Sequence, residues 1–152
     1  MKVIDDIKTV LAKDPVFPQQ KTKKPSEKVL IVEDDKILLE MYHDKFIHEG
    51  YDVLTAENGK IGLEKAITLK PNIILLDLMM PVMDGKRMLS KLREFPQFKQ
   101  LPVIVLTNAG QVDNIKETQR YDNACEFLIK SNVSVDDVVG KVKFWLHAFS
   151  LE

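Results

Sequence analysis

The sequence lacks features that several classes of protein require. It has a single cysteine, Cys125, so no internal disulfide can form. It has neither a cleavable signal pattern nor an apolar run long enough to cross a membrane. Together these absences predict a cytoplasmic protein that has no membrane partner.

Other kinds of binding site are also missing. The chain carries 22 basic and 23 acidic residues, so it lacks the positive excess of proteins that bind nucleic acid irrespective of sequence, and we expect no direct nucleic-acid contact. Neither G-x-G-x-x-G nor the P-loop pattern occurs, which argues against a nucleotide-binding domain. His43, His48 and His147 have neither a Cys partner nor i, i+4 spacing, so no transition-metal site is expected.

What the chain does contain is typical of one globular domain. Hydrophobic residues make up 45% and charged residues 30% of the 152 residues, which is close to the average for packed domains. A chain of this length buries a core without disulfides or structural metal. We therefore expect a single domain, with no room for a second one.

From residue 28 onward, short apolar runs alternate with helical patterns. Apolar runs without helical spacing, bounded by turn-forming residues, are typical of strands buried in a parallel sheet. They predict strands at residues 29–32, 52–56, 72–77, 103–106 and 126–129, and helices at 36–48, after Asn58-Gly59, and at 87–94, 114–121 and 134–148. Strand–helix repeats with short connections imply an α/β fold, a doubly wound parallel sheet with five strands and five helices.

The two ends of the chain have a different composition. Residues 1–27 predict a short helix, with Val3, Ile7, Val10 and Leu11 at helical spacing, and then a linker rich in Pro and Lys. This N-terminal extension either packs on the domain or belongs to a neighbouring module, or it docks a partner or a second copy, and the sequence leaves these interpretations open. Residues 150–152 are interpreted as a tail, in which a vector remnant is one explanation.

Polar side chains follow four of the predicted strands at the point where each strand ends. If the first and third strands are neighbours, their carboxylates meet at the carboxyl edge of the sheet, where open α/β folds place their ligands. Clustered carboxylates repel one another, so they either raise a pKa or hold a cation, and oxygen ligands of this kind suit Mg²⁺. The residues in question are Glu33 and Asp34, Asp77, Thr107, and Lys130.

This set of side chains predicts a site for phosphoryl transfer. Asp77 would attack phosphorus, Mg²⁺ would neutralise charge on the phosphoryl oxygens, and Thr107 and Lys130 would bind those oxygens after transfer. A lone Asp at a strand end is explained as well by capping of the next helix. The joint placement on four strand ends is what favours the functional interpretation.

Four stretches, VLIVEDD, NIILLDLMMPVMDG, VIVLTNA and FLIK, resemble the receiver domain of two-component response regulators, of the CheY-like, stand-alone kind. The resemblance covers about residues 28 to 148, and we place the receiver domain at 28–149. It implies a flavodoxin-like sheet with strand order 2-1-3-4-5.

The resemblance also implies a role for each site residue. Asp77 is then the phosphoacceptor, and Glu33 and Asp34 form the acidic pair. Mg²⁺ is bound by this acidic cluster, in particular by Asp34, Asp77 and the Met79 carbonyl. Thr107 is then the switch hydroxyl and Lys130 the phosphate-binding lysine, and together with Asp77 they form the catalytic set. Phe127, on the fifth strand, occupies the aromatic switch position.

Members of this family signal; they are not enzymes that turn over a metabolite. The resemblance implies that the chain takes a phosphoryl group from the phosphohistidine of a sensor histidine kinase or phosphotransfer protein, and that it catalyses its own phosphorylation and dephosphorylation. Only one helix is predicted after Lys130, so we expect no C-terminal helix-turn-helix. The signal would then leave through helix 114–121, the fifth strand and the last helix to an unknown downstream protein, and homodimerisation is left open.

The chain departs from the family pattern at several positions. Phe127 stands where Tyr is commoner, and Asn123 where Gly is common. Ser131 stands where Pro is usual, so we expect either a trans peptide with a shifted loop or a strained cis peptide. The stretch from Thr107 to Lys130 is one residue longer than usual. Met79 and Ala109 are apolar, and we expect them to slow dephosphorylation.

Two other functions compete with this interpretation. Phosphatases of the haloacid dehalogenase type also use a strand-end Asp with Mg²⁺, but they need a second acid two residues later, where this chain has Met79. A degenerate receiver that binds a partner without being phosphorylated is the more serious alternative. The complete carboxylate, Thr and Lys set argues against it, and Phe127 and Ser131 keep it open.

Overall fold

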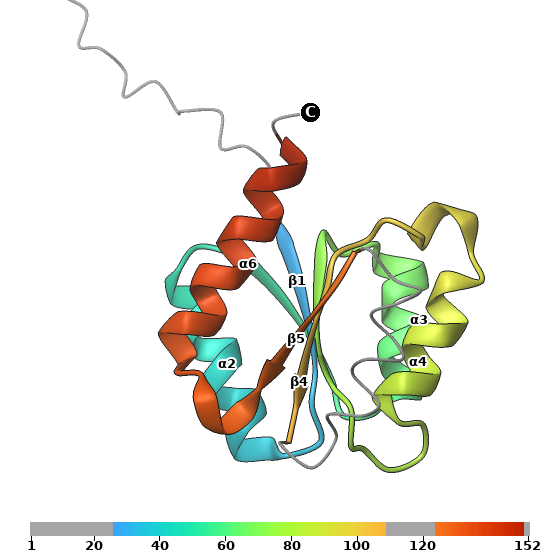
Figure 1. Cartoon of the computed structure of the whole chain (residues 1–152), viewed down its shortest axis with the longest axis horizontal. Coiled ribbons are helices and arrows are strands. Elements are labelled where there is room, and N and C mark those ends of the chain that lie inside the picture. The colour runs from blue at the N-terminus through green and yellow to red at the C-terminus, as the bar shows by residue number, and fades with distance from the viewer. Residues whose placement is uncertain (1–25, 109–123, 151–152) are drawn as a thin grey trace, which may run out of the picture.

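The computed structural model describes residues 26–108 and 124–150 (Figure 1). Within these ranges the chain forms a three-layer α/β domain. The predicted helices at residues 3–11 and 114–121 lie outside the described residues, as do Ala109, Asn123 and the end of the predicted tail.

Five parallel strands form one sheet. They are β1 (Lys28–Val32), β2 (Asp52–Ala56), β3 (Ile73–Asp77), β4 (Val103–Thr107) and β5 (Cys125–Ile129). Their order is β2-β1-β3-β4-β5, and each neighbouring pair is parallel. The predicted flavodoxin-like fold with strand order 2-1-3-4-5 is therefore confirmed, and β2 and β5 are the edge strands.

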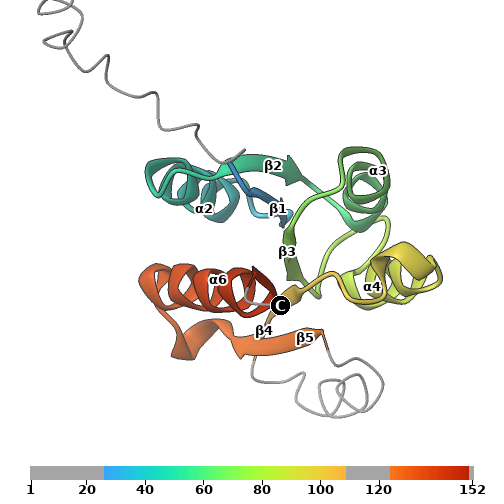
Figure 2. The ribbon, with the colours of Figure 1, turned by 90° about the horizontal axis from the view of Figure 1, so that it is seen from above.

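Four helices cover the sheet within the described residues: α2 (Lys36–His48), α3 (Gly59–Leu69), α4 (Gly85–Arg93) and α6 (Val135–Ser150). Two short 3₁₀ turns, η1 (Pro96–Phe98) and η3 (Lys130–Asn132), connect other elements. Seen from above, α2 and α6 lie on one face of the sheet, and α3 and α4 lie on the other (Figure 2). None of the helices in the described parts is long and apolar enough to span a membrane.

Side chains just before the helices determine where the helices begin. Asp35 Oδ1 accepts hydrogen bonds from the N–H groups of Ile37 and Leu38, at 3.0 and 3.2 Å, and Asn58 Oδ1 accepts one from Ile61 at 2.9 Å. Such caps satisfy N–H groups that have no partner inside the helix and contribute about 1 kcal/mol each.

Helix capping also explains why the predicted start of α4 was wrong. The third described helix, α4, was expected to begin at Arg87, but it begins two residues earlier, at Gly85. The reason is that Asp84 is its cap, since its Oδ1 accepts a hydrogen bond from the Arg87 N–H at 2.8 Å. The last helix likewise ends later than expected, at Ser150.

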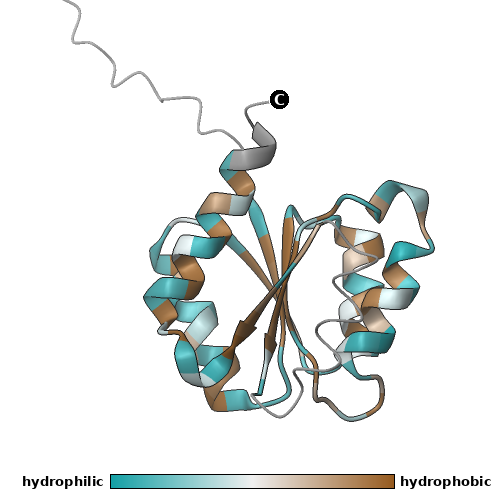
Figure 3. Ribbon diagram, viewed as in Figure 1, coloured by the Kyte–Doolittle hydropathy of each residue, from teal (hydrophilic) through white to brown (hydrophobic). Residues whose placement is uncertain are grey.

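A hydrophobic core lies on each side of the sheet (Figure 3). Strands β3 and β4 are buried at every residue, and β1 at all but the first, as expected for strands covered on both faces. On the α6 side, Val138, Val142 and Leu146 are buried and Trp145 packs against the core, whereas Phe144 is 65% exposed. The apolar side of α6 is therefore largely a packing surface.

Gly85 and Gly140 differ in the space that surrounds them, so substituting each of them tests this packing. A Cβ atom on Gly85 would lie 2.2 Å from the Asp77 carbonyl oxygen, whereas one on Gly140 would meet nothing within 4 Å. We expect Gly85→Ala to lower the free energy of unfolding by about 1–3 kcal/mol, because the backbone next to Asp77 must shift. Gly140→Ala, the matched control in α6, should raise it by about 0.5–1 kcal/mol. Urea unfolding measures both, and equal effects of the two variants would contradict the packing described here.

Candidate functional site

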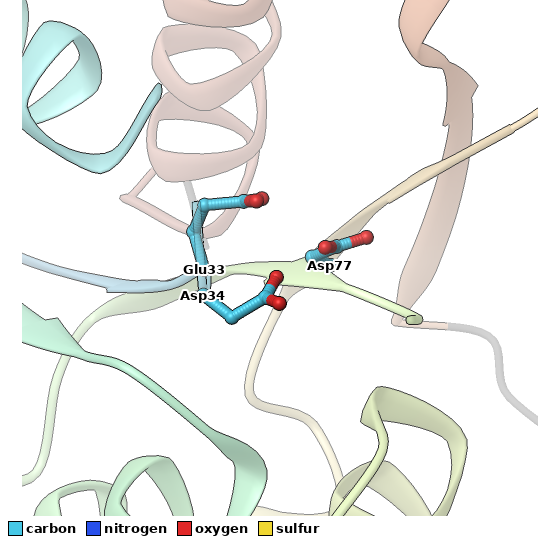
Figure 4. Close-up of side chains that lie close together, drawn as sticks. All are labelled: Glu33, Asp34 and Asp77. Carbon is cyan, nitrogen blue, oxygen red and sulfur yellow. The ribbon is translucent and has the colours of Figure 1, made fainter. Parts of the chain in front are cut away.

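Three carboxylates meet where β1 and β3 end (Figure 4). Glu33 and Asp34 directly follow β1, and Asp77 is the last residue of β3. One oxygen from each group can be chosen so that all three lie within 4.8 Å of one another. Glu33 and Asp77 are buried, and Asp34 is exposed at the rim. The three side chains therefore form one cluster that is open to solvent on one side.

The register of the sheet is what brings these groups together. Val32 lies beside Leu76, so the residues that follow β1 are level with Asp77. Asp77 in turn lies beside Leu106, which places Thr107 just beyond it, and Thr107 lies beside Ile129, which places Lys130 just beyond the end of β5. Four strand ends thus deliver polar side chains to one edge of the sheet, as expected from the sequence.

Lys130 is the cation of the site. Its Nζ lies 3.2 Å from Asp77 Oδ1 and 3.4 Å from Glu33 Oε2. Burial by itself lowers the pKa of Lys130, but attraction by Asp77 and then by Glu33 outweighs burial, so the pKa rises. Lys130 therefore stays charged and bridges the two buried carboxylates.

One ammonium does not balance three carboxylates. Burial and the nearby charge of Asp77 raise the pKa of Glu33 to about 7, against the lowering effect of Lys130. Burial also raises the pKa of Asp77, although Lys130 and the Met79 N–H act in the opposite direction. Two buried acids with raised pKa values show that their ionised forms are unfavourable here, so that either a proton or a further cation would relieve the repulsion.

The donor atoms fit a hard divalent cation. All three ligating side chains are carboxylates, and oxygen donors of this kind are preferred by Mg²⁺ over softer metals. Helix capping does not explain why these three acids lie together. Within the described residues, α2 and α4 are capped by Asp35 and Asp84, and none of the three clustered acids caps a helix.

Not all of the predicted site residues touch the cluster. Thr107 is buried at the end of β4, and its hydroxyl donates to the Asn108 carbonyl oxygen at 3.4 Å. Met79 donates its N–H to Asp77 Oδ1 at 3.3 Å, while its side chain is 56% exposed. Phe127 is half-buried in the middle of β5 and packs against the core on the α3 and α4 side, so it lies outside the cluster.

The sequence left open whether the Lys130–Ser131 peptide is cis or trans. The described residues contain no cis peptide bond, so the strained cis alternative is wrong and the trans alternative holds. Residues Lys130–Asn132 form the turn η3 directly after β5. The Lys130 ammonium nevertheless reaches both buried carboxylates, so the Ser at position 131 is compatible with a lysine in the site.

Sequence reasoning missed several residues that shape the site. Asp35 donates its N–H to Glu33 Oε1 at 3.3 Å and so helps to orient that carboxylate. Gly85 donates its N–H to the Leu78 carbonyl oxygen and so closes the loop of residues 78–85 that follows β3. Val82 has φ 69°, a left-handed conformation that is unusual for a β-branched residue, and no pattern in the sequence indicates it.

The chain is similar to known proteins in sequence. The family model described as "Response regulator receiver domain" matches residues 29–143. Response regulator PleD of Caulobacter vibrioides is 36% identical over 115 residues, which are 75% of this chain and 24% of PleD. The DNA-binding dual master transcriptional regulator RpaA of Synechocystis sp. is 29% identical over 116 residues, which are 76% of this chain and 47% of RpaA.

Solved structures agree with these matches. The receiver domain of the Francisella response regulator 1452 superposes with a TM-score of 0.71 at 30% identity, covering 82% of this chain and 99% of that one. Chemotaxis response regulator CheY4 of Vibrio cholerae has the same TM-score at 27% identity, covering 79% and 98%. The chain thus matches whole receiver domains, but it spans less than half the length of PleD and RpaA.

The pKa of Glu33 predicts how stability depends on pH in metal-free buffer. Its pKa is 4.5 in the unfolded chain and about 7 in the folded one, so between these values the folded state keeps a proton that the unfolded state loses. The contribution is fully present below pH 4.5 and is lost as the pH rises to about 7, by up to about 3 kcal/mol. Glu33→Gln should remove this decline in urea unfolding, and the exposed control Glu64→Gln should keep it. A decline that is the same in both variants would contradict the assignment to Glu33.

Proposed function

Because the chain belongs to the family of response regulator receiver domains, we propose that it is a phosphorylation-dependent signalling domain that accepts a phosphoryl group on Asp77. The observation that carries this proposal is the position of Asp77. Asp77 is only 5% exposed, lies at the end of β3, and has beside it the two acidic residues that follow β1 and the ammonium of Lys130.

The two oxygens of Asp77 are not equivalent. Oδ1 contacts both Lys130 Nζ and the Met79 N–H, whereas Oδ2 has no hydrogen bond or ion pair within the described residues. Oδ2 is therefore the oxygen proposed to attack phosphorus. The new O–P bond forms as the N–P bond to the imidazole of a phosphohistidine breaks, and the electron pair of the broken bond stays on the imidazole nitrogen.

The surrounding residues bind the charge that the reaction brings in. Glu33, Asp34, Asp77 and the Met79 carbonyl would hold Mg²⁺, which supplies positive charge against the phosphoryl oxygens when it is bound. Lys130, already 3.2 Å from Asp77, supplies a second positive charge from the opposite strand end. The Thr107 hydroxyl is a third group, because its bond of 3.4 Å to Asn108 is weak and can be exchanged for a bond to phosphate.

Transfer changes the distribution of charge in the site. The carboxylate of Asp77 becomes a neutral acyl group, and about two negative charges appear on the phosphoryl oxygens beyond it. Groups that follow this charge, in particular Lys130 and Thr107, draw their strands with them and shift the domain between two states. Phe127 is proposed as part of that switch, where it differs from the commoner Tyr by lacking a hydroxyl group.

Partners follow from the family. Receiver domains interact with histidine kinases or phosphotransfer proteins, and we propose such a protein as the phosphoryl donor. The output is proposed to pass through a surface that includes β5 and α6. RpaA is named as DNA-binding, but this chain has no basic excess, so we propose that it does not contact DNA itself. A cytoplasmic location and the 28–149 boundaries of the domain stay predictions.

Small phosphodonors test the proposal directly. Incubation of the full chain with acetyl phosphate and Mg²⁺ should add one phosphoryl group, seen by mass spectrometry, because the site supplies its own charge neutralisation. Asp77→Asn and removal of Mg²⁺ with a chelator should each abolish the addition, whereas Asp84→Asn, which alters the α4 cap, should leave it intact. An unmodified wild-type chain would instead support the degenerate receiver, a binding module that works without phosphorylation.

The lifetime of the acyl phosphate is a second test. The exposed thioether of Met79 lies beside Asp77 and offers an attacking water no strong hydrogen-bond partner. Met79→Asn should shorten the lifetime severalfold by supplying one, as measured by loss of the phosphoryl group over time. Met41→Asn, the same change at a 43% exposed methionine on α2, serves as control. An unchanged lifetime in Met79→Asn would contradict a role for this side chain.

A further inference from the structure

Strand β5 connects the carboxylate site to the only tryptophan of the chain. Lys130, directly after β5, contacts Asp77 and Glu33. Near the other end of the strand, Glu126 uses both carboxylate oxygens to bind α6. Its Oε2 accepts a hydrogen bond from Trp145 Nε1 at 2.5 Å, and its Oε1 lies 2.8 Å from Lys141 Nζ. One five-residue strand is thus held by side chains at both ends.

The position of β5 in the sheet makes it the strand most easily displaced near the site. Among the described residues it is an edge strand that pairs with β4 alone, from Val103↔Cys125 to Thr107↔Ile129. β1 and β3 are paired on both sides, so moving either of them would break two ladders of hydrogen bonds. A force on Lys130 therefore meets less resistance along β5 than a force on Asp77 meets along β3.

The side chains of β5 alternate between the two faces. Cys125 and Phe127 pack into the core under α3 and α4, whereas Leu128 packs into the core under α6. Glu126 is half-buried and bound to α6 by two contacts of different kinds, an indole N–H donor and an ammonium. A shift of the strand must therefore change the geometry at Trp145, or break one of these contacts.

We propose that Glu126 is a positioning residue that transmits the phosphorylation state of Asp77 to α6, where the indole of Trp145 responds to it. This inference rests on the proposed function. A phosphoryl group on Asp77 moves negative charge outward from Oδ1, the atom that Lys130 contacts, and the ammonium follows that charge. Lys130 then displaces the end of β5, and Glu126 passes the displacement to Trp145 and Lys141.

Trp145 lies in the C-terminal half of α6, whereas Lys130 lies in the turn that precedes the N-terminal end of that helix. Trp145 lies ten residues after Val135, the first residue of α6, which corresponds to about 15 Å along the helix. Glu126 precedes Lys130 by four residues, or about 13 Å of strand. A ligand-dependent signal from Trp145 consequently reports a change that has passed through the protein.

The experiment uses the full chain, Mg²⁺ and beryllofluoride as the phosphoryl mimic. Fluorine NMR detects the bound mimic, and the single indole N–H resonance and the fluorescence of Trp145 detect the response, with unambiguous assignment because the chain has one tryptophan. In the wild type, we expect the indole resonance and the emission to shift as the bound fluorine signal appears. Both shifts should be lost in Asp77→Asn.

Variants of Glu126 test whether the signal passes from the site to Trp145 through this residue. Glu126→Ala should still bind the mimic but should lose most of the Trp145 response, because the acceptor of the indole N–H is gone. Glu126→Gln keeps an acceptor oxygen and should retain the response, and it is the informative variant if Glu126→Ala does not fold. Glu64→Gln, on the opposite face, is the matched control and should respond like the wild type.

Each other outcome overturns the proposal. A bound fluorine signal in the wild type with no change at Trp145 would show that the site is not coupled to α6, while the proposed function would stand. An undiminished response in folded Glu126→Ala would show that the path does not run through Glu126. The absence of both bound mimic and acetyl-phosphate labelling would overturn the proposed function together with this inference.

Discussion

The contact between the Lys130 ammonium and two buried carboxylates is the interaction on which the rest of the site depends. Without it, Asp77 and Glu33 would be two buried acids that have no other cation beside them in the described part of the chain. Even with it, burial leaves both pKa values raised, and that of Glu33 lies at about 7. A site in this state favours a further cation, and the proposed phosphoryl transfer to Asp77 needs that cation together with the positive charge of Lys130.

The surrounding fold keeps that site rigid by close backbone packing. Gly85 lies so close to the Asp77 carbonyl that a Cβ atom would not fit, and the Gly59 N–H donates to the Met83 carbonyl oxygen across the same loop. Val82 is held in the left-handed conformation within this loop, at a cost of about 1 kcal/mol or more. Order in the loop after β3 is thus maintained by contacts from α3 and α4, so these helices support the acceptor although they supply none of its ligands.

Rigidity at Asp77 contrasts with the freedom of β5. The acceptor strand is central and paired on both sides, whereas the strand that leads to Lys130 is an edge strand. A change in charge at a fixed acceptor therefore displaces the more weakly held partner. This asymmetry is the physical basis of the proposed transmission from Asp77 to α6 through Glu126 and Trp145.

Much of the fold could be predicted from the sequence, because strands and helices follow from local patterns. The apolar runs ending at Glu33 and Asp77, the alternation with helices, and the residue types at four strand ends all lie in short stretches. The start of α4 was misplaced because its cap, Asp84, lies outside the apolar pattern from which the helix was predicted. Only the tertiary structure decided the trans geometry at Ser131, the conformation of Val82, and the contacts of Lys130 with Glu33, 97 residues away, and of Glu126 with Trp145. Contacts between distant residues depend on strand order, register and the packing of helices, and no local pattern of residues encodes these.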